Sequence, residues 1–166
     1  MAAEKPESIL LASHLWLWVV GLEIVHQVLS AVQVALAPEL LVRQMREYAA
    51  DSQMPLTQDT ISVLVYASVA SVAVFAIAIM GVVLWMALVL SRGGSFAAFA
   101  RRALLFFGVY LGVRLITVFV PPETTAHVAW VIVDGCVQIG VSVLAILAVY
   151  LITRKESLHW TGESHG

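Results

Sequence analysis

Residues 101–154 read RRALLFFGVYLGVRLITVFVPPETTAHVAWVIVDGCVQIGVSVLAILAVYLITR, and this stretch predicts two membrane-spanning helices folded back on each other. Its apolar runs, 103–120 and 128–152, are close to the length of about 20 residues with which a helix crosses a hydrocarbon core of about 30 Å. A pair of prolines begins the turn between them. Because apolar residues do not alternate with polar ones, the runs are unlike the strands of a membrane barrel.

Each of these two predicted helices carries one charged side chain where lipid tails belong. Arg114 lies seven residues before Pro121, and Asp134 lies seven residues after His127. At a rise of about 1.5 Å per residue, both charges are roughly 10 Å below the same membrane face. An unpaired arginine at such a depth costs on the order of 3 kcal/mol or more. We therefore predict that Arg114 and Asp134 form the main buried ion pair.

The rest of the chain has the same apolar character. Of its 166 residues, 61% are apolar and 12% are charged, whereas roughly a quarter of the residues in a soluble domain are charged. Two further apolar windows, 10–37 and 61–90, raise the number of predicted spans to four. The first window is longer than a signal-peptide core, so we expect it to be retained. The sequence predicts an all-α, polytopic membrane protein in which residues 1–166 form a single domain.

The distribution of lysine and arginine predicts the orientation in the bilayer, because cytoplasmic loops carry an excess of both. Arg43 and Arg46 lie between the first two windows, on the side opposite the termini. We expect both termini to be cytoplasmic. The formal net charge of −2 gives no basis for nucleic-acid binding. Six of the nine basic residues fall on the side of the termini: Lys5, Arg92, Arg101, Arg102, Arg154 and Lys155.

A polar stripe runs along the first predicted helix, because its polar residues are spaced three or four apart and so share one face. Such a stripe must face protein or water rather than lipid. Glu23 in this stripe lies at a depth similar to that of Arg114, so the arginine has a second candidate carboxylate. We predict one structural, intramembrane polar network, made of Glu23, His26, Gln27, Arg114, Asp134 and Gln138.

No motif for catalysis or cofactor binding accompanies this network. Glu23-x-x-His26 is half of a carboxylate-bridged di-metal motif, but no second pair of this kind lies in the other apolar windows. A haem held by two histidines would need another histidine at the depth of His26, and the sequence offers none. Cys136 is the single cysteine, so there is no disulfide framework or zinc motif. We expect a protein that is not an enzyme and that holds no metal or cofactor.

Two loops have patterns of their own. In residues 38–60, Leu41, Met45 and Tyr48 recur at helical spacing, which predicts a short amphipathic helix on the outer surface between the first two spans. The inner loop carries three arginines that set the topology. Alternatively, they contact the head groups of anionic lipids. These possible lipid contacts are Arg92, Arg101 and Arg102.

Small residues predict where helices approach each other closely. The third predicted helix contains Gly108 and Gly112 in a GxxxG pattern, and Gly112 lets another helix approach near the arginine. The second predicted helix carries a face of small residues, for which close helix packing is the simplest interpretation. This small-residue face consists of Ala67, Ser71, Ala78 and Gly81.

Leu15-Trp16, Val133-Asp134-Gly135 with Gln138, and Arg154-x-Glu156-Ser157 resemble segments of small four-helix membrane proteins of actinobacteria. Some proteins of that kind are accessory subunits of the respiratory supercomplex that joins cytochrome bcc to an aa3-type oxidase. The resemblance implies a place in the bacterial inner membrane beside larger integral membrane subunits, with a stabilising or lipid-organising role and no redox centre.

Three functions therefore remain open at the level of the sequence, and the last of them is a lipid-binding envelope protein that uses Arg92, Arg101 and Arg102. The first is a non-catalytic accessory subunit of a larger membrane complex. The second is a small proton-coupled transporter or channel that acts as a homo-oligomer through Glu23, His26, Arg114 and Asp134, because intramembrane ionisable residues relay protons in such proteins.

Overall fold

The computed structural model describes residues 5–52, 56–119 and 128–163. Helices make up nearly all of this part of the chain, which confirms the all-α prediction. In chain order the elements are α1 (Glu7–Leu36), α2 (Glu39–Asp51), α3 (Gln58–Arg92), α4 (Ala97–Arg114), the 3-10 helix η1 (Leu115–Phe119), α5 (Val128–Ile152) and α6 (Lys155–Trp160).

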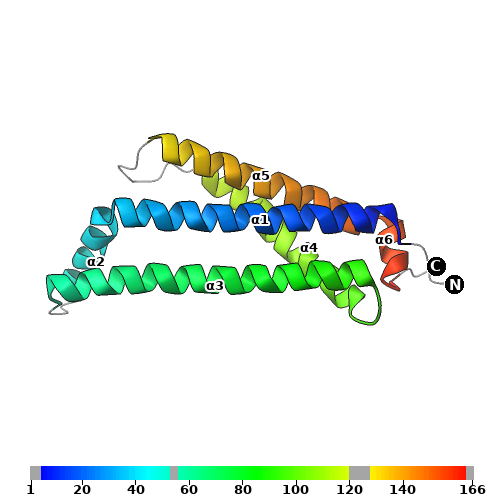
Figure 1. The fold of residues 1–166 in the computed structure, drawn as a ribbon, viewed down its shortest axis with the longest axis horizontal. Coiled ribbons are helices and arrows are strands. Elements are labelled where there is room, and N and C mark those ends of the chain that lie inside the picture. The colour runs from blue at the N-terminus through cyan, green and yellow to red at the C-terminus, as the bar shows by residue number, and fades with distance from the viewer. Residues whose placement is uncertain (1–4, 53–55, 120–127, 164–166) are drawn as a thin grey trace.

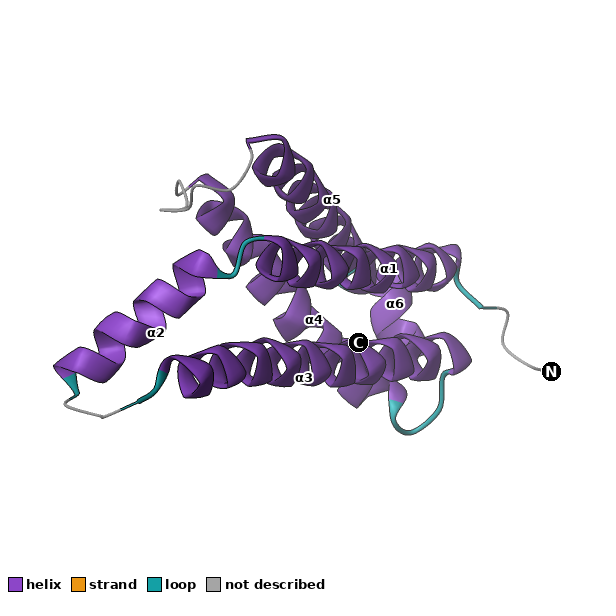
Figure 2. Ribbon diagram, turned by 60° about the vertical axis from the view of Figure 1, so that its left-hand side comes forward, coloured by secondary structure: helices purple, strands orange, loops and turns teal. Residues whose placement is uncertain are grey.

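Four long helices form the bundle, and α1 lies between α3 and α5 (Figure 1). Helix α4 crosses behind α1 and packs on both α3 and α5, so the contacts among the four helices close into a ring. Helix α2 connects the far ends of α1 and α3 (Figure 2). The start of α1 and the short helix α6 lie together at the opposite end of the bundle, because the side chain of Ser8 donates a hydrogen bond to Glu156 at 3.2 Å.

Three helices of the described chain are long and apolar enough to cross a membrane: α1, α3 and the segment Ala129–Ile152 of α5. Helix α3 has 35 residues and is about 50 Å long, more than a hydrocarbon core requires.

The third predicted span, 103–120, differs from the observed helix. Helix α4 begins earlier, at Ala97, and its α-helical geometry ends at Arg114, where η1 takes over. Because α4 includes three arginines, it does not meet the same criterion of length and composition. A fourth span, and cytoplasmic placement of both termini, therefore remain predictions.

The hydrophobic core is concentrated in the half of the bundle near α6. Trp16, Leu90, Leu104 and Ile152 come from four different helices, and all are completely buried there. Toward α2 the helices are less closely packed, and along this part of the bundle α3 exposes large apolar side chains such as Phe75. Helix packing is therefore strongest at the end where the two ends of the described chain meet.

The two predicted small-residue surfaces have different outcomes. A Cβ atom added to Gly108 would lie 2.1 Å from Cγ2 of Val149, and one added to Gly112 would lie 3.3 Å from Cγ1 of Ile146. The GxxxG prediction is therefore confirmed, because both glycines let α4 approach α5 closely. The small-residue face of α3 is different, because all four of its residues are exposed. A Cβ added to Gly81 would meet no atom within 4 Å, so close packing of this face inside the described chain is not observed.

The segment between α1 and α3 contains the expected helix, α2. Its Ala49 is buried and its Tyr48 is exposed, and the side chain of Arg46 donates a hydrogen bond to Gln58 at the start of α3. The helix is thus attached to α3. That its apolar face lies on a membrane surface remains a prediction.

Candidate functional site

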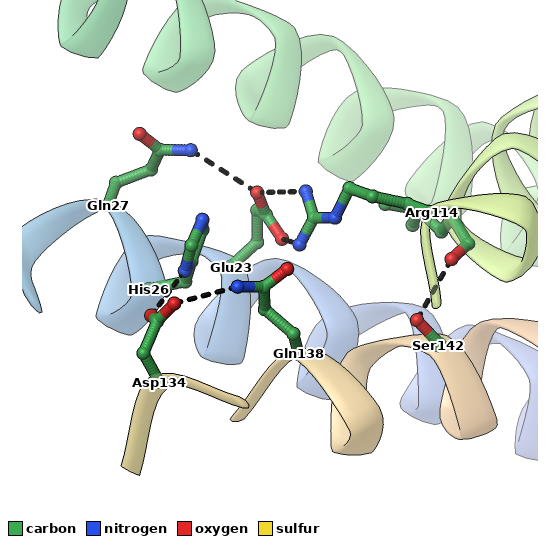
Figure 3. A network of polar contacts seen from close by, with 8 residues as sticks. Glu23, His26, Gln27, Arg114, Asp134, Gln138 and Ser142 are labelled. Carbon is green, nitrogen blue, oxygen red and sulfur yellow. Dashed lines mark hydrogen bonds and ion pairs between the residues drawn. The ribbon is translucent and has the colours of Figure 1, made fainter. Parts of the chain in front are cut away.

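A buried ion pair joins α1 to α4 near the middle of the bundle (Figure 3). Nη1 and Nη2 of Arg114 donate to Oε1 and Oε2 of Glu23, each at 2.8 Å. The Glu23 side chain is 3% exposed and the Arg114 side chain is 17% exposed. The prediction that Asp134 is the main partner of Arg114 is therefore wrong. Glu23 and Asp134 were both candidate partners, because they lie at similar predicted depths. Glu23, on α1, is the one that accepts two hydrogen bonds from Arg114.

Asp134 forms a second ion pair instead, and this one joins α5 to α1. Its Oδ1 lies 2.5 Å from Nδ1 of His26, and its Oδ2 accepts a hydrogen bond from Nε2 of Gln138 at 2.7 Å. Gln138 lies four residues further along α5, so one turn of the helix positions the amide against the carboxylate. The imidazole carries a positive charge in this pair only when it is protonated.

Gln27 completes the cluster on the side of α3. Its Nε2 donates to Oε1 of Glu23 at 3.3 Å, and its amide oxygen points away from the carboxylate in Figure 3. The structure thus brings all six residues of the predicted network into one cluster on α1, α4 and α5. Close to it, the Ser142 hydroxyl donates to the backbone oxygen of Leu111 at 2.9 Å, a second polar link between α5 and α4.

A cavity of about 290 Å³ lies between α1, α2 and α3, beside this network. Gln27 belongs both to its wall and to the hydrogen bonds of Glu23, so the cavity comes within one side chain of the buried carboxylate. Ser30 and Ser68 add two hydroxyls to a lining that is otherwise apolar. Within the described ranges, no group of three or more His, Cys, Asp or Glu residues is placed to hold a metal ion.

The three arginines predicted to contact lipid have different surroundings. Arg92 is exposed at the end of α3. Arg101 and Arg102 both bind the carboxylate of Glu163, with Nε of Arg101 2.5 Å from Oε2 and Nε of Arg102 2.7 Å from Oε1. Hydrogen bonds from Arg101 and Arg102, reinforced by their charges, lower the pKa of Glu163 to about 2.

The C-terminal segment that carries Glu163 was not predicted to be structured. In this segment, which we call the C-terminal latch (residues 155–163), Nε1 of Trp160 donates to the backbone oxygen of Leu90 at 3.1 Å. The indole also covers Gly93, where α3 ends with a φ of 74°. Few features of the sequence indicated this latch. They were a tryptophan and a glutamate in a polar tail, and two adjacent arginines in a loop.

The two polar features thus have separate roles in the architecture. The network of Glu23, His26, Arg114 and Asp134 joins the long helices inside the bundle, whereas the latch joins their ends. No protein-family model, curated protein or solved structure matches this chain.

Proposed function

We propose that this chain is an integral membrane protein that serves as a non-catalytic subunit of a larger membrane assembly. The observation that carries the proposal is the exposed small-residue face of α3. Small residues on a membrane helix allow another helix to approach closely, and the four helices of this bundle leave that face open. A helix of a neighbouring subunit would fill it.

The buried charges support a structural role for the network. Glu23 is bound by Arg114, and Asp134 is bound by His26, so each carboxylate has a cationic or ionisable partner from another helix. Paired in this way, the groups hold α1 against α4 and α5 at a modest cost in the membrane interior.

The resemblance noted in the sequence makes the proposal more specific. We propose a bacterial inner-membrane protein that accompanies the respiratory supercomplex and contacts anionic lipids. Its larger partners would then carry haem, whereas this chain would carry no redox centre.

The experiment is purification of the tagged chain in a mild detergent with identification of the proteins that co-purify. We expect larger membrane subunits, and haem absorbance if the partners are respiratory. Gly81→Leu should abolish co-purification by filling the small-residue face. Tyr66→Trp, which adds bulk at an exposed position of α3 outside that face, is the matched control. Purification of the chain alone, or equal recovery of partners with both variants, would contradict the proposal.

A second candidate, a proton-coupled transporter or channel, is favoured by the cavity that reaches Gln27 beside Glu23. It predicts that the chain purifies as a homo-oligomer and acidifies liposomes under an imposed gradient. Replacing Gln27 by Leu should then slow the proton flux while Glu23 and Arg114 remain paired.

A further inference from the structure

Arg101 and Arg102 form a fork of hydrogen-bond donors at the α6 end of the bundle. Four N–H-bearing nitrogens converge on one carboxylate: Nε and Nη2 of Arg101 each lie 2.5 Å from Oε2 of Glu163, and Nε and Nη2 of Arg102 lie 2.7 and 2.6 Å from Oε1. The only other side-chain contact of this carboxylate within the described residues is the hydroxyl of Thr161, at 3.2 Å from Oε2. The arrangement is therefore a built anion site, occupied by an anion from the same chain.

The charges in this site do not balance. Two guanidinium groups bring two positive charges, and one carboxylate brings a single negative charge. Arginine forks bind phosphate in the same two-bond geometry as carboxylate, and a phosphate group offers more acceptor oxygens and up to two negative charges. A phosphate group thus matches the donors and the charge of this pair better than Glu163 does.

The surroundings allow an exchange of anions. The Arg101 side chain is 10% exposed, so its guanidinium is held in place by its surroundings. The Arg102 side chain is 68% exposed, so its guanidinium is accessible from outside the protein. Glu163 follows Gly162, which has a φ of 73°, and lies beyond the end of α6. The backbone N–H of Glu163 donates to the backbone oxygen of Leu158 at 2.9 Å, so release of the carboxylate would need only rotation of the Glu163 side chain, with Trp160 in place against α3.

We infer that Arg101 and Arg102 form a binding site for a phosphate group, and that the carboxylate of Glu163 occupies this site as an intramolecular competitor. The phosphate comes either from a lipid head group, since the site lies at one end of the apolar helices, or from a soluble anion. The inference concerns Arg101, Arg102 and the latch. Its lipid source rests on the proposed contact with anionic lipids, but the site does not depend on the proposed partner subunits.

The test uses the full chain in nanodiscs of phosphatidylcholine, with two probes. One arm adds phosphatidic acid to the bilayer, and the other adds inorganic phosphate to the buffer. Amide hydrogen exchange of residues 158–163 measures release of the carboxylate, and we expect faster exchange as the effective probe is added. The arm that responds identifies the source of the phosphate.

Three variants decide whether Arg101 and Arg102 are responsible for binding the probe. For the variants, binding is followed by equilibrium titration of the probe itself. Glu163→Gln removes the competitor and should tighten binding of the probe about tenfold, which corresponds to 1.4 kcal/mol. Arg102→Gln, at an exposed position that should not disturb folding, should weaken binding about tenfold or more. Arg43→Gln, an exposed arginine on α2 at the opposite end of the bundle, is the matched control and should bind like the wild type. Equal binding by all variants, or no response to either probe, would overturn the inference.

Discussion

Arg114 and Glu23 form a two-bond ion pair between α4 and α1, with both guanidinium contacts at 2.8 Å. Because the Glu23 side chain is almost completely buried, neither partner can lose the other without leaving a charge in a poorly solvated place.

Removing one partner of this pair should therefore be worse than removing both. We expect Arg114→Ala to lower the free energy of unfolding by about 3–5 kcal/mol, as for other broken buried pairs, and the double variant Glu23→Ala/Arg114→Ala to lose less. Unfolding in mixed micelles with increasing dodecyl sulfate measures the difference. Arg92→Ala, at an exposed position at the end of α3, is the control. If both variants lose the same free energy, the pair is not coupled.

The second pair should depend on hydrogen bonding as well as on charge. Asp134→Asn keeps a side chain that can still contact His26 and Gln138, whereas Asp134→Ala leaves two side chains without their partner. Loss of a partner from a buried hydrogen bond costs about 1–3 kcal/mol. We expect the thermal midpoint of the alanine variant to be the lower of the two, by differential scanning fluorimetry in detergent. The opposite order would argue against this contact.

Three glycines should respond differently to alanine, according to the space around each. Gly108→Ala places a methyl group 2.1 Å from Cγ2 of Val149, which predicts an overpacking loss of about 1–3 kcal/mol. Gly112→Ala meets Ile146 at 3.3 Å and should lose less. Gly81→Ala meets nothing and should be neutral or stabilising by up to about 1 kcal/mol, because alanine favours helix.

The Gly108 prediction has an internal check. The double variant Gly108→Ala/Val149→Ala removes the clashing methyl groups and should recover part of the lost free energy of unfolding. Failure of this rescue would show that the glycine acts through something other than the contact between α4 and α5.

The C-terminal latch should be stable at neutral pH and open in acid. The pKa of Glu163 falls from 4.5 to about 2 in the folded protein, so its contribution to stability is fully present above pH 4.5 and is lost as the pH falls toward 2. The protection factors of the amides of residues 158–163, which compare each exchange rate with that of an unstructured peptide at the same pH, should therefore fall across this range. Glu163→Gln should show low protection factors at every pH, and a pH-dependent protection factor in that variant would point to another group.

The sequence predicted the elements better than it predicted their contacts. Long apolar runs fix where a helix lies, and α5 matches the predicted window of 128–152. Counting residues along the predicted helices also identified the buried charges. The pairing of Arg114 did not follow, because two carboxylates lie at similar depths and the rotation of each helix about its axis decides which one the guanidinium meets.

The errors elsewhere have related causes. Helix α4 begins at Ala97, before its apolar run, because Arg101 and Arg102 are bound by Glu163 and need not lie in a loop. Glu163 is 62 residues away from Arg101, and such distant pairs leave no local pattern. The small residues of α3 predicted close helix packing, which is not observed among the described residues, because composition cannot say whether a helix of the same chain covers such a face.

The ion pair between α1 and α4 also sets an order of events during synthesis. Glu23 leaves the ribosome 91 residues before Arg114, and His26 leaves it 108 residues before Asp134. At about 5–20 residues per second, the acidic first helix waits roughly 5–20 s for the arginine that neutralises it. We expect the insertion machinery to shelter that helix from lipid until the second half of the chain arrives, so translation speed between them should affect how much protein matures.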